Sequence, residues 1–369
     1  MAHIVIDARI INSTSGRYVE RLLSYLERVN TDLDLGPRHT YTVLVPHKDL
    51  DYWKPKTDSF QLVGVSIDNY SLAEQTEFKR LIESLSPDLV HFCMPQQPVL
   101  YKGKTVTTFH DMTLVKTYNS DKNWLVFHAK QFVGKWVFKR VARKSTEVIA
   151  ISEFTKKELI EFTGISEDAV TVTYEAGEVT TDRIKPFSSP FKQYILYVGQ
   201  QSDYKNIKRL GDAHQELLKT NPELGLILAG KVNAGVRRNQ AYFESKHYKN
   251  ILFTDFVPDE ELNWLYTHAS AYVFPSLMEG FGLPGLEVMA HGTPLVSSNA
   301  TCLPEIYGDA AHYFDPYDTK DIARAIQDVL TDEMLQRTLV TNGYNQIKKY
   351  SWKKMAEQTL AIYEKALAK

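Results

Sequence analysis

Two glutamates flank a glycine-rich turn in the second half of the chain, in the segment Glu-Gly-Phe-Gly-Leu-Pro-Gly-Leu-Glu that runs from Glu279 to Glu287. Gly280 and Gly282 let the backbone bend sharply and let a ligand approach closely. Pro284 suits the first turn of a helix, whose unpaired amides would favour an anion. Carboxylates that accept from paired hydroxyls commonly hold a ribose or a sugar. The pattern is typical of a nucleotide-sugar site, and also of a plain strand-to-helix turn with acids that complement the helix dipole.

Two further residues have the chemistry to contact phosphate or sugar. Lys205 is predicted to open a helix, where the helix dipole disfavours a cation unless an anion binds nearby. A phosphate-binding lysine is therefore favoured over a solvated one. His110 ends the strand-like run Thr-Val-Thr-Thr-Phe, at the carboxyl edge of a sheet, where ligands bind. The alternative is a histidine held in a turn with Asp111.

The elements that must position these residues alternate between strands and helices. Short runs rich in Val, Ile, Thr and Phe predict strands in the first half at 3–10, 41–46, 60–66, 88–95, 105–111, 147–152 and 170–176. Helical spacing between them is clearest over 17–29, where Val19, Leu22, Leu23, Leu26 and Val29 share one face. Nearly continuous apolar strands separated by helices predict a parallel sheet covered on both sides.

The same alternation resumes after a polar stretch with two prolines at 177–193, which we interpret as a linker. Strands are predicted at 194–199, 225–230, 251–257, 271–276, 293–298 and 311–316, and helices at 205–219, 259–269, 283–290 and 320–330. The prediction is α/β, with two doubly wound, Rossmann-like domains that face each other across a cleft. The predicted bounds are 1–185 for the first domain, 186–350 for the second domain and 351–369 for a C-terminal helix.

Composition narrows the possible partners. The 369 residues are 43% hydrophobic and 24% charged, with a formal net charge of -2, so nothing indicates a nucleic-acid binder. The chain opens directly into a strand-like run, and no apolar segment approaches the length of a membrane span. Cys93 and Cys302 lie far apart in apolar contexts, which argues against a disulfide framework. We expect a cytoplasmic protein.

Several segments together resemble the retaining, GT-B-fold glycosyltransferases of family 4. The paired-glutamate segment looks like that family's motif, and Phe109–Asp111 resembles its His-Asp turn. Further segments match the family in the expected order: 151–159, 196–206, 253–276, 303–316 and the final helix. The resemblance spans most of the chain and is clearest in the second half.

The resemblance implies that 1–185 is an acceptor-side domain, that 186–350 binds the nucleotide sugar and that the helix 351–369 returns to the first domain. It also implies roles for individual residues. Lys205 would neutralise the leaving diphosphate, while His110 and Glu279 would contact the transferred sugar, and these three are the predicted catalytic residues. Glu287 would hold the ribose. The remaining predicted donor contacts come from the glycine loops and their neighbours: Ser15, Gly16, Gly199, Gly280, Phe281, Gly282 and Leu283. The family's retention of configuration is usually explained by front-face attack, in which the departing phosphate takes the acceptor proton. No metal and no cofactor are expected.

This chain departs from the family pattern at two places. Where relatives usually carry an arginine beside the lysine or after the glycine, the sequence has Gln200, Gln201 and Tyr204. Lys231 or Arg209 is hypothesised to compensate. The first-domain loop keeps one glycine, in Thr-Ser-Gly-Arg-Tyr, so the assignment of Ser15 and Gly16 is the weaker one.

Two other signals are interpreted as structural. Asp32-Leu-Asp34 and Asp49-Leu-Asp51 imitate a metal-binding Asp-X-Asp but fall in polar connections, where chance is the better explanation. The aromatic and basic stretch 124–145 would suit an anionic membrane. On a helix, however, its basic residues spread around the circumference, which favours a partly buried helix. Peripheral contact with the inner face of a membrane stays open.

The functional hypothesis is a metal-independent, retaining transferase that moves a hexose from a nucleotide sugar to a glycan or lipid-linked glycan during surface polysaccharide synthesis. GDP-mannose is the first donor candidate, followed by UDP-hexoses and dTDP-rhamnose. Two alternatives remain. A non-catalytic nucleotide-sugar binder is supported by the absent arginine but disfavoured by the presence of Lys205, His110 and both glutamates, and a UDP-sugar epimerase on the same fold is disfavoured by the paired-glutamate motif. We expect the acceptor near Ser13–Arg17, Met94–Pro98 and the segment after His110.

Overall fold

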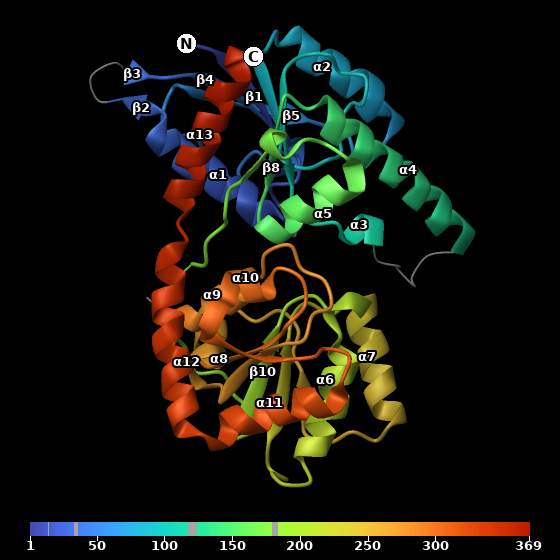
Figure 1. Cartoon of the computed structure of the whole chain (residues 1–369), viewed down its shortest axis with the longest axis vertical. Helices are drawn as coiled ribbons and strands as arrows, with labels where there is room; N and C mark the ends of the chain where they lie inside the picture. The colour runs from blue at the N-terminus through green and yellow to red at the C-terminus, as the bar shows by residue number, and fades with distance from the viewer. Residues whose placement is uncertain (14, 33–35, 117–123, 179–183) are drawn as a thin grey trace. The chain divides into compact units, whose positions relative to one another are not determined.

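The computed structural model describes residues 1–13, 15–32, 36–116, 124–178 and 184–369. These form two compact units, each built on its own parallel sheet (Figure 1). Unit 1 is Met1–Glu175 with Ser351–Lys369, and unit 2 is Ala176–Tyr350. Unit 2 begins before the predicted boundary at 185, because the backbone at Gly177 packs tightly on Leu286: a Cβ there would lie 2.7 Å from the leucine Cβ. Residues 179–183 of the predicted linker lie outside the described residues.

In unit 1, seven strands of the described residues pair in parallel in the order β5-β4-β1-β6-β7-β8-β9. Most of their residues are apolar, and most are buried, as in sheets covered by helices on both sides. The strands are β1 His3–Asp7, β4 Thr40–Pro46, β5 Phe60–Val65, β6 Leu89–Phe92, β7 Thr105–Phe109, β8 Glu147–Ala150 and β9 Val170–Val172. A short antiparallel pair, β2 Thr31–Asp32 and β3 Gly36–Pro37, lies outside this sheet.

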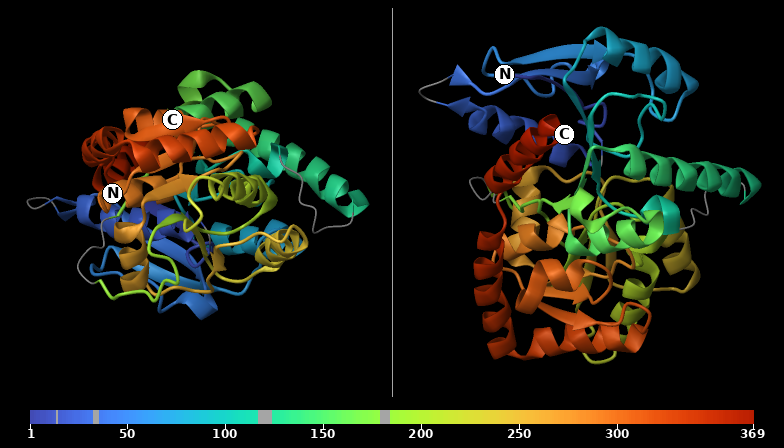
Figure 2. Two further views of the ribbon diagram at one scale, coloured as in Figure 1. Left: turned by 90° about the horizontal axis from the view of Figure 1, so that it is seen from below. Right: turned by 45° about the horizontal axis from the view of Figure 1, so that its top comes forward.

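Helices cover both faces of this sheet (Figures 1 and 2). On one face, Phe78 and Ile82 pack on β1 and β6, and the helices α4 and α5 pack on β7 and β8. The helices α1 and α13 cover the other face and contact each other. The bounds are α1 Gly16–Val29, α2 Lys79–Ser84, α3 Thr113–Lys116, α4 Trp124–Lys144, α5 Glu153–Thr163 and α13 Trp352–Ala368, with a π-helical turn at Glu74–Phe78 and 3₁₀ turns at His47–Asp49 and Glu167–Ala169.

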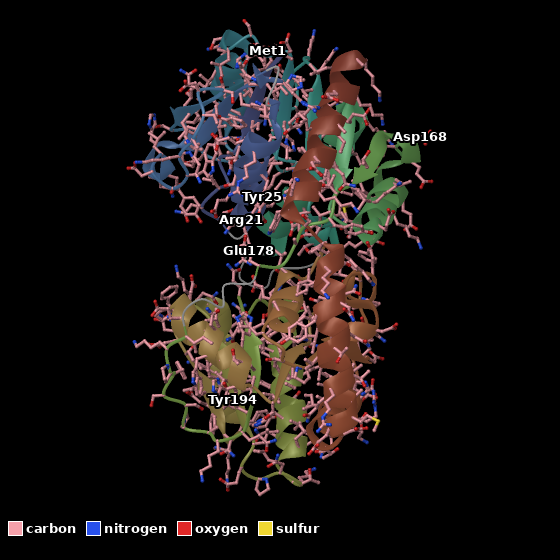
Figure 3. The ribbon with its side chains drawn as sticks, turned by 90° about the vertical axis from the view of Figure 1, so that its left-hand side faces the viewer. Met1, Arg21, Tyr25, Asp168, Glu178 and Tyr194 are labelled. Atoms are coloured by element: carbon pink, nitrogen blue, oxygen red, sulfur yellow. The ribbon has the colours of Figure 1, made fainter. Side chains whose placement is uncertain are left out.

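The periodicity of 17–29 predicted the buried face of α1 correctly. Val19, Leu22, Leu23 and Leu26 are fully buried, while Val29 is partly exposed. Arg21 and Tyr25, both labelled in Figure 3, are partly exposed residues of the same helix. The helix therefore directs its apolar stripe into unit 1, as an amphipathic surface helix does.

In unit 2, six strands of the described residues pair in parallel in the order β12-β11-β10-β13-β14-β15. They are β10 Tyr194–Val198, β11 Gly225–Ala229, β12 Ile251–Phe253, β13 Ala271–Phe274, β14 Leu295–Ser298 and β15 Ala311–Phe314. The helices are α6 Ile207–Leu217, α7 Ala234–Ser245, α8 Asp259–His268, α9 Leu283–Ala290, α10 Leu303–Tyr307, α11 Thr319–Thr331 and α12 Glu333–Gln346, with 3₁₀ turns at Asp203–Lys205, Gly308–Ala310 and Ile347–Lys349. The two predicted doubly wound sheets are confirmed.

Strand order locates the ligand-binding edge of each sheet. In unit 2 the chain builds outward from β10 to β12 on one side and then returns to place β13 on the other side of β10. In unit 1 the same reversal separates β1 from β6. At such a switch point the loops leave the carboxyl ends of adjacent strands in opposite directions, which opens a crevice suited to a ligand. The loops after β10 and β13, and those after β1 and β6, are therefore the first places to look.

A chain of buried hydrogen bonds connects α13 to the rest of unit 1. The Tyr363 hydroxyl lies 2.6 Å from Nδ1 of His91, and the other ring nitrogen of His91 lies 2.9 Å from the Thr108 hydroxyl. Thr108 in turn lies 3.0 Å from the hydroxyl of Tyr18 on α1. Burial, with a smaller contribution from nearby His110, lowers the pKa of His91 to about 3, so its ring is neutral. A neutral imidazole has one donor and one acceptor nitrogen, and this series of hydrogen bonds uses both.

Removing the last hydroxyl of this chain tests how firmly α13 is held. In a Tyr363→Phe variant, a ring nitrogen of His91 loses its partner while remaining fully buried. We expect the free energy of unfolding to fall by about 1–3 kcal/mol, the cost of an unsatisfied buried polar group. Denaturant titration measures it, with Tyr52→Phe at a half-exposed position as control. Equal stability of both variants would show that the chain of hydrogen bonds contributes nothing net.

Candidate active site

The loop after β10 carries the predicted phosphate-binding lysine. Gly199 leaves the strand with φ 138° and donates its N–H to the carbonyl of Ala229 at 2.9 Å. A Cβ on Gly230 would lie 2.5 Å from the Gly199 carbonyl oxygen, so the two loops pass in close contact and need a glycine there. Lys205 does not open the helix as predicted. It ends a 3₁₀ turn, and α6 starts two residues later, because Asn206 adopts a left-handed conformation between them.

Asn206 fixes this loop to the ends of two other strands. Its buried side-chain amide donates to the carbonyls of Pro275 at 3.1 Å and Pro316 at 2.7 Å, which follow β13 and β15. Its Oδ1 accepts from Arg209 at 2.9 Å. Asparagine tolerates the left-handed conformation better than most residues, and here φ is 62°. One side chain thus sets the path of the lysine loop along the carboxyl edge of the sheet.

Lys205 and Glu279 form a close charge pair across this edge. The lysine Nζ lies 2.5 Å from Oε1 of the glutamate, and the two side chains are only 16% and 13% exposed. The lysine also lies over the rings of Tyr204 and Phe274, at 5.1 and 5.7 Å from their centroids. The Leu277 N–H donates to the Tyr204 carbonyl at 2.8 Å, so the backbone joins the same two loops. The structure therefore brings together two of the predicted catalytic residues.

The glutamate end of this pair is held by the loop before α10. The Glu279 N–H donates to the Thr301 hydroxyl at 3.2 Å, and the Cys302 thiol donates to the Glu279 carbonyl at 3.4 Å. Cys302 is fully buried, so it packs and donates in the core of unit 2. The backbone of Glu279 is thus tied down while its carboxylate points to Lys205.

The glycines of the motif are required by Tyr307. The tyrosine hydroxyl donates to the Gly282 carbonyl at 2.5 Å, and a Cβ on Gly282 would lie 2.3 Å from the hydroxyl oxygen. A Cβ on Gly285 would meet the same ring at 2.3 Å. Gly282, with φ 98°, is also the N-cap of α9, which begins at Leu283 with Pro284 in its first turn, as predicted. Close packing on one aromatic ring thus explains part of the glycine pattern without any ligand.

Phe281 and Glu287 lie on opposite sides of this turn. The Phe281 side chain is 3% exposed and packs edge-on against Tyr350, with 5.6 Å between ring centroids, so only its backbone is available to a ligand. Glu287 accepts from the Tyr266 hydroxyl at 3.4 Å. Burial first, and then the charges of Glu287 and Glu279, raise the pKa of the buried Tyr272. Both carboxylates of the motif therefore act on one buried tyrosine of β13.

Gln201, which stands near the position of the family's usual arginine, differs in environment from Lys231 and Arg209, the two residues hypothesised to compensate for that arginine. Gln201 is buried, its Oε1 accepts from Asn239 on α7 at 3.1 Å, and it anchors the loop. A Cβ on Gly235 would lie 2.2 Å from the Gln201 carbonyl oxygen. Lys231 is exposed, with its Nζ 5.4 Å from the Phe256 ring centroid. Arg209 is held by Asn206 and lies over Tyr317, 5.5 Å from the ring centroid.

In unit 1, His110 follows β7 directly, as predicted, and is 8% exposed. Its Nε2 lies 2.9 Å from the Cys93 carbonyl oxygen, and its Nδ1 lies 3.5 Å from the Glu175 carboxylate. The Tyr18 ring meets the imidazole edge-on at 4.8 Å. The predicted alternative, a turn with Asp111, is wrong in its partner, because Asp111 accepts from the Thr113 N–H. Only an imidazole protonated on both nitrogens can donate to both oxygens.

The surroundings of His110 raise its pKa, which favours the ring protonated on both nitrogens. Burial alone lowers the pKa of His110, but Glu175, the Cys93 carbonyl and Asp111 outweigh it, and the pKa is raised. Glu175 lies in the predicted strand 170–176, and no residue spacing signalled that it would reach a histidine from another strand. A buried acid next to a candidate histidine can be found only once the sheet order is known.

The first-domain glycine loop is explained by packing. A Cβ on Gly16 would lie 1.9 Å from the Ile11 carbonyl oxygen, so α1 starts hard against the preceding turn. Ser15 precedes it without a side-chain capping hydrogen bond. The expected acceptor segment includes Thr14, which lies outside the described residues.

A buried ion triad near these loops was not predicted. Arg9 donates to both carboxylate oxygens of Asp7 at 2.8 Å and to Glu74 at 2.8 Å, and its guanidinium lies 3.6 Å from the centroid of the Phe78 ring. It fixes the end of β1 to the π-helical turn.

No group of three or more potential metal ligands occurs within the described residues. Asp49 of the second Asp-X-Asp accepts from Asn12, and Asp51 pairs with Lys54, while Asp34 of the first lies outside the described residues.

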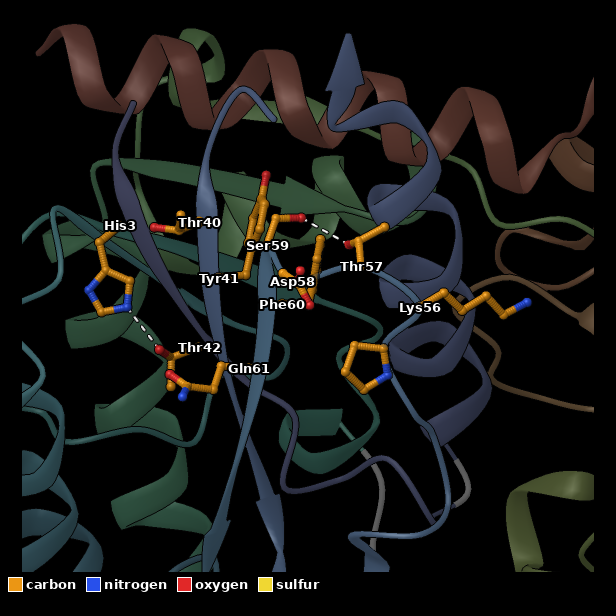
Figure 4. A pocket seen from close by; sticks show the side chains of 11 residues that line it. His3, Thr40, Tyr41, Thr42, Lys56, Thr57, Asp58, Ser59, Phe60 and Gln61 are labelled. Carbon is orange, nitrogen blue, oxygen red and sulfur yellow. Dashed lines mark hydrogen bonds between the residues drawn. The ribbon is translucent and has the colours of Figure 1, made fainter. Parts of the chain in front are cut away.

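A polar cavity of about 570 Å³ opens at the amino ends of β1, β4 and β5, lined by His3, Thr42, Lys56 and Ser59 among others (Figure 4). This is the edge opposite His110. None of the predicted site residues lines it.

Comparisons with known proteins agree with this arrangement. Residues 15–176 match the family described as Glycosyltransferase Family 4, and residues 179–346 match that described as Glycosyl transferases group 1. The chain is 30% identical over 287 residues to O-antigen chain mannosyltransferase B of Escherichia coli, covering 71% of this chain and 70% of that protein. It is 31% identical over 283 residues to the Escherichia coli serotype-specific mannosyltransferase WbdA, covering 72% of this chain and 34% of that protein. This chain therefore spans about a third of WbdA.

Solved structures of low sequence identity share the fold. Sucrose-phosphate synthase from Thermosynechococcus elongatus superposes with a TM-score of 0.78 at 18% identity and full coverage of both chains. Anabaena Alr3699/HepE in complex with UDP and glucose superposes with a TM-score of 0.72 at 15% identity, covering 99% of this chain and 100% of that one.

Changing Glu175 tests the environment of His110. In Glu175→Gln, burial remains while the carboxylate is lost, so we expect the pKa of His110 to fall, as measured by NMR titration of its ring protons. A histidine whose pKa is higher in the folded protein than its unfolded value of about 6.5 stabilises the fold at a pH below that unfolded value. This stabilisation is lost as the pH rises through the folded pKa. Glu175→Gln should therefore lose more stability relative to wild type at pH 5.5 than at pH 9. An unchanged titration, matching Glu161→Gln on the exposed side of α5, would contradict the assignment.

Proposed function

Because the chain belongs to the family 4 glycosyltransferases of GT-B fold, we propose that it transfers a hexose from a nucleotide sugar to a glycan or lipid-linked glycan. The proposed setting is the assembly of a surface polysaccharide. GDP-mannose is the first donor candidate, since mannosyltransferases of O-antigen synthesis and an MMP alpha-(1->4)-mannosyltransferase of Mycolicibacterium hassiacum are among the relatives. UDP-hexoses and dTDP-rhamnose are the next candidates.

The observation that supports this proposal most is the pair formed by Lys205 and Glu279 at the switch point of unit 2. An ammonium and a carboxylate 2.5 Å apart satisfy each other. A donor supplies both with better partners: its diphosphate for the lysine, and its sugar hydroxyls for the glutamate. The pair is thus a preformed receptor for a molecule that carries an anion next to a polyol.

The motif turn would add uncharged donors to this site. The start of α9 presents amides that have no helical partner, and a helix N-terminus favours an anion. Glu287, one turn into the same helix, would accept from the ribose hydroxyls. In this proposal the protein's contribution is mainly positioning and neutralisation of the leaving group's charge.

The proposed stereochemical course is retention without a metal. The sugar–phosphate bond breaks as the acceptor hydroxyl approaches the same face, and the departing diphosphate takes the hydroxyl proton. Lys205 would stabilise the negative charge that grows on the diphosphate. His110, whose pKa is raised by Glu175 and the Cys93 carbonyl, would serve as a donor or a fixed positive charge and not as a base.

Two alternatives use the same residues differently. A non-catalytic binder would hold the donor without turning it over, and the point in its favour is that Gln200, Gln201 and Tyr204 stand where relatives usually carry an arginine. An epimerase would release a rearranged sugar with no acceptor added. Product analysis separates the three: a lengthened glycan, an unchanged donor, or a new sugar isomer.

Replacing the lysine tests the catalytic proposal. We expect Lys205→Ala to reduce transfer, and the slow hydrolysis of donor, by about 100-fold or more, as loss of a key electrostatic donor does in other enzymes. The assay uses GDP-mannose, UDP-hexoses and dTDP-rhamnose with EDTA present, and the product anomer is read by NMR. Lys208→Ala, an exposed lysine in the first turn of α6, is the matched control.

Near-normal rates in Lys205→Ala would contradict the assignment of the lysine. Activity only with added Mg²⁺ would refute the metal-free course, and an inverted product would refute retention. Donor binding with no turnover in the wild type would favour the non-catalytic alternative.

A further inference from the structure

The loop after β5 brings one aromatic side chain to the switch point of unit 1. β5 is the edge strand of its sheet and lies three places away from β6 in the strand order. Its loop nevertheless reaches the loop after β6, because the Tyr70 hydroxyl donates to Oε1 of Gln96 at 3.1 Å. Gln75 adds two hydrogen bonds, to the Gln97 carbonyl at 3.1 Å and from the Val99 N–H at 2.8 Å. The loop therefore crosses the carboxyl ends of β4 and β1, where such sheets bind ligands.

Tyr70 has a backbone conformation that costs free energy. Its φ is 62°, in the left-handed region, where a bulky side chain is rarely found. The residue is also 69% exposed, so burial of its ring does little to offset this cost. Strained residues persist only where their surroundings hold them, and they cluster at functional sites.

The buried ion triad of unit 1 holds Tyr70 in this conformation. Glu74 accepts from the Tyr70 N–H at 3.2 Å through one carboxylate oxygen and from Arg9 at 2.8 Å through the other. Arg9 also donates to the Ile67 carbonyl at 3.4 Å and to Asp7. The three charged residues are each 6% exposed or less, and burying charge is costly even when the charges are paired. Positioning of Tyr70 gives this costly arrangement a function.

A buried amide lies beside the Tyr70 ring. Gln96 is 7% exposed and belongs to the segment Met94–Pro98, where we expect the acceptor. Its Oε1 accepts from the Tyr70 hydroxyl, while no residue in the described part of the chain accepts from its Nε2. A buried amide donor without a partner calls for a ligand group that can accept a hydrogen bond.

A carboxylate lies on the other side of the same crevice. Desolvation first, and then the charges of Glu74 and Asp111, raise the pKa of Tyr70, so Asp111 is close enough to act on it. One oxygen of Asp111 accepts from the Thr113 N–H at 2.7 Å, and its other oxygen has no hydrogen-bond partner among the described residues. Asp111 directly follows His110, which places the Tyr70 ring near the predicted catalytic histidine.

The charges around the ring select the class of ligand. The triad has one carboxylate in excess, and Asp111 adds a second negative charge, so a phosphate is disfavoured here. An uncharged sugar suits every group present. One face of a pyranose carries C–H groups that pack on an aromatic ring, and its hydroxyls both donate and accept hydrogen bonds.

On the basis of the proposed transfer reaction, we propose that Tyr70 is the platform on which a pyranose ring of the acceptor glycan stacks. Gln96 donates to the hydroxyls of this sugar and Asp111 accepts from them, while the triad around Arg9 positions the platform. The platform recognises an uncharged sugar of the acceptor and makes no contact with the nucleotide of the donor.

Titration of sugars into the full chain, with no donor present, tests this. The probes are neutral α-linked trisaccharides of mannose, rhamnose, glucose or galactose, and their affinities are measured by NMR. Tyr70→Asn should weaken the trisaccharide that binds best by about tenfold or more, and Gln96→Met by about threefold. Because asparagine tolerates a left-handed backbone, Tyr70→Asn should also raise the melting temperature by about 2–4 °C. Its affinity for GDP and UDP should not change.

Tyr52→Asn is the matched control, since Tyr52 is an exposed tyrosine of the same unit without a left-handed backbone. It should bind the trisaccharides as the wild type does and gain no stability. Equal affinities of the wild type and Tyr70→Asn, or no trisaccharide binding by the wild type, would overturn the proposal. So would a loss of GDP and UDP affinity in Tyr70→Asn, which would assign the ring to the donor. Trisaccharide binding that depends on Tyr70, with no turnover of any donor, would refute the transfer reaction alone.

Discussion

The charge pair between Lys205 and Glu279 is the interaction on which the arrangement of unit 2 depends. It joins the loop after β10 to the loop after β13, the two strands that flank the switch point. Asn206 and the Leu277 N–H make the same connection through buried and backbone hydrogen bonds. With both charged groups only partly exposed, neither is well solvated, and each therefore needs the other or a ligand. A charged pair that would be better satisfied by an anion next to a polyol is suited to a sugar nucleotide.

Unit 1 meets the cost of buried charge in the same way. His110 is placed between the Cys93 carbonyl and the Glu175 carboxylate, and Arg9 is placed between Asp7 and Glu74. The first arrangement raises the pKa of a histidine at the carboxyl edge of the sheet, whereas the second fixes the end of β1. Tyr18 joins the histidine to the fold: it packs on His110 and starts the hydrogen-bond chain that ends at α13. The terminal helix thus supports the histidine through buried side chains.

Sequence reasoning predicted the strands well because their apolar runs are buried on both faces, and it placed His110 and Gly282 in their observed positions. It was wrong about Lys205, since the left-handed Asn206 that delays α6 has no signature in periodicity. The glycines of the motif were interpreted through ligand approach, but Gly282 and Gly285 also make room for Tyr307, which lies in another helix. The contact of Glu175 with His110 could not have been predicted, because it depends on which elements the folded sheet places next to each other. Helix α12 lacks a strong apolar stripe and was not predicted.

The central claim, that the Lys205–Glu279 pair receives the donor, is tested most directly by calorimetric titration of nucleotides into paired variants with EDTA present. Lys205→Met should weaken the binding of both GDP and GDP-mannose by about tenfold or more. If another donor is preferred, the same holds for that sugar nucleotide and its nucleoside diphosphate. Glu279→Gln should weaken the binding of the sugar nucleotide. It should leave the affinity for the free diphosphate unchanged or higher, because the Glu279 carboxylate no longer competes for the lysine. Equal affinities in all three proteins, or equal weakening of both ligands by Glu279→Gln, would contradict the account.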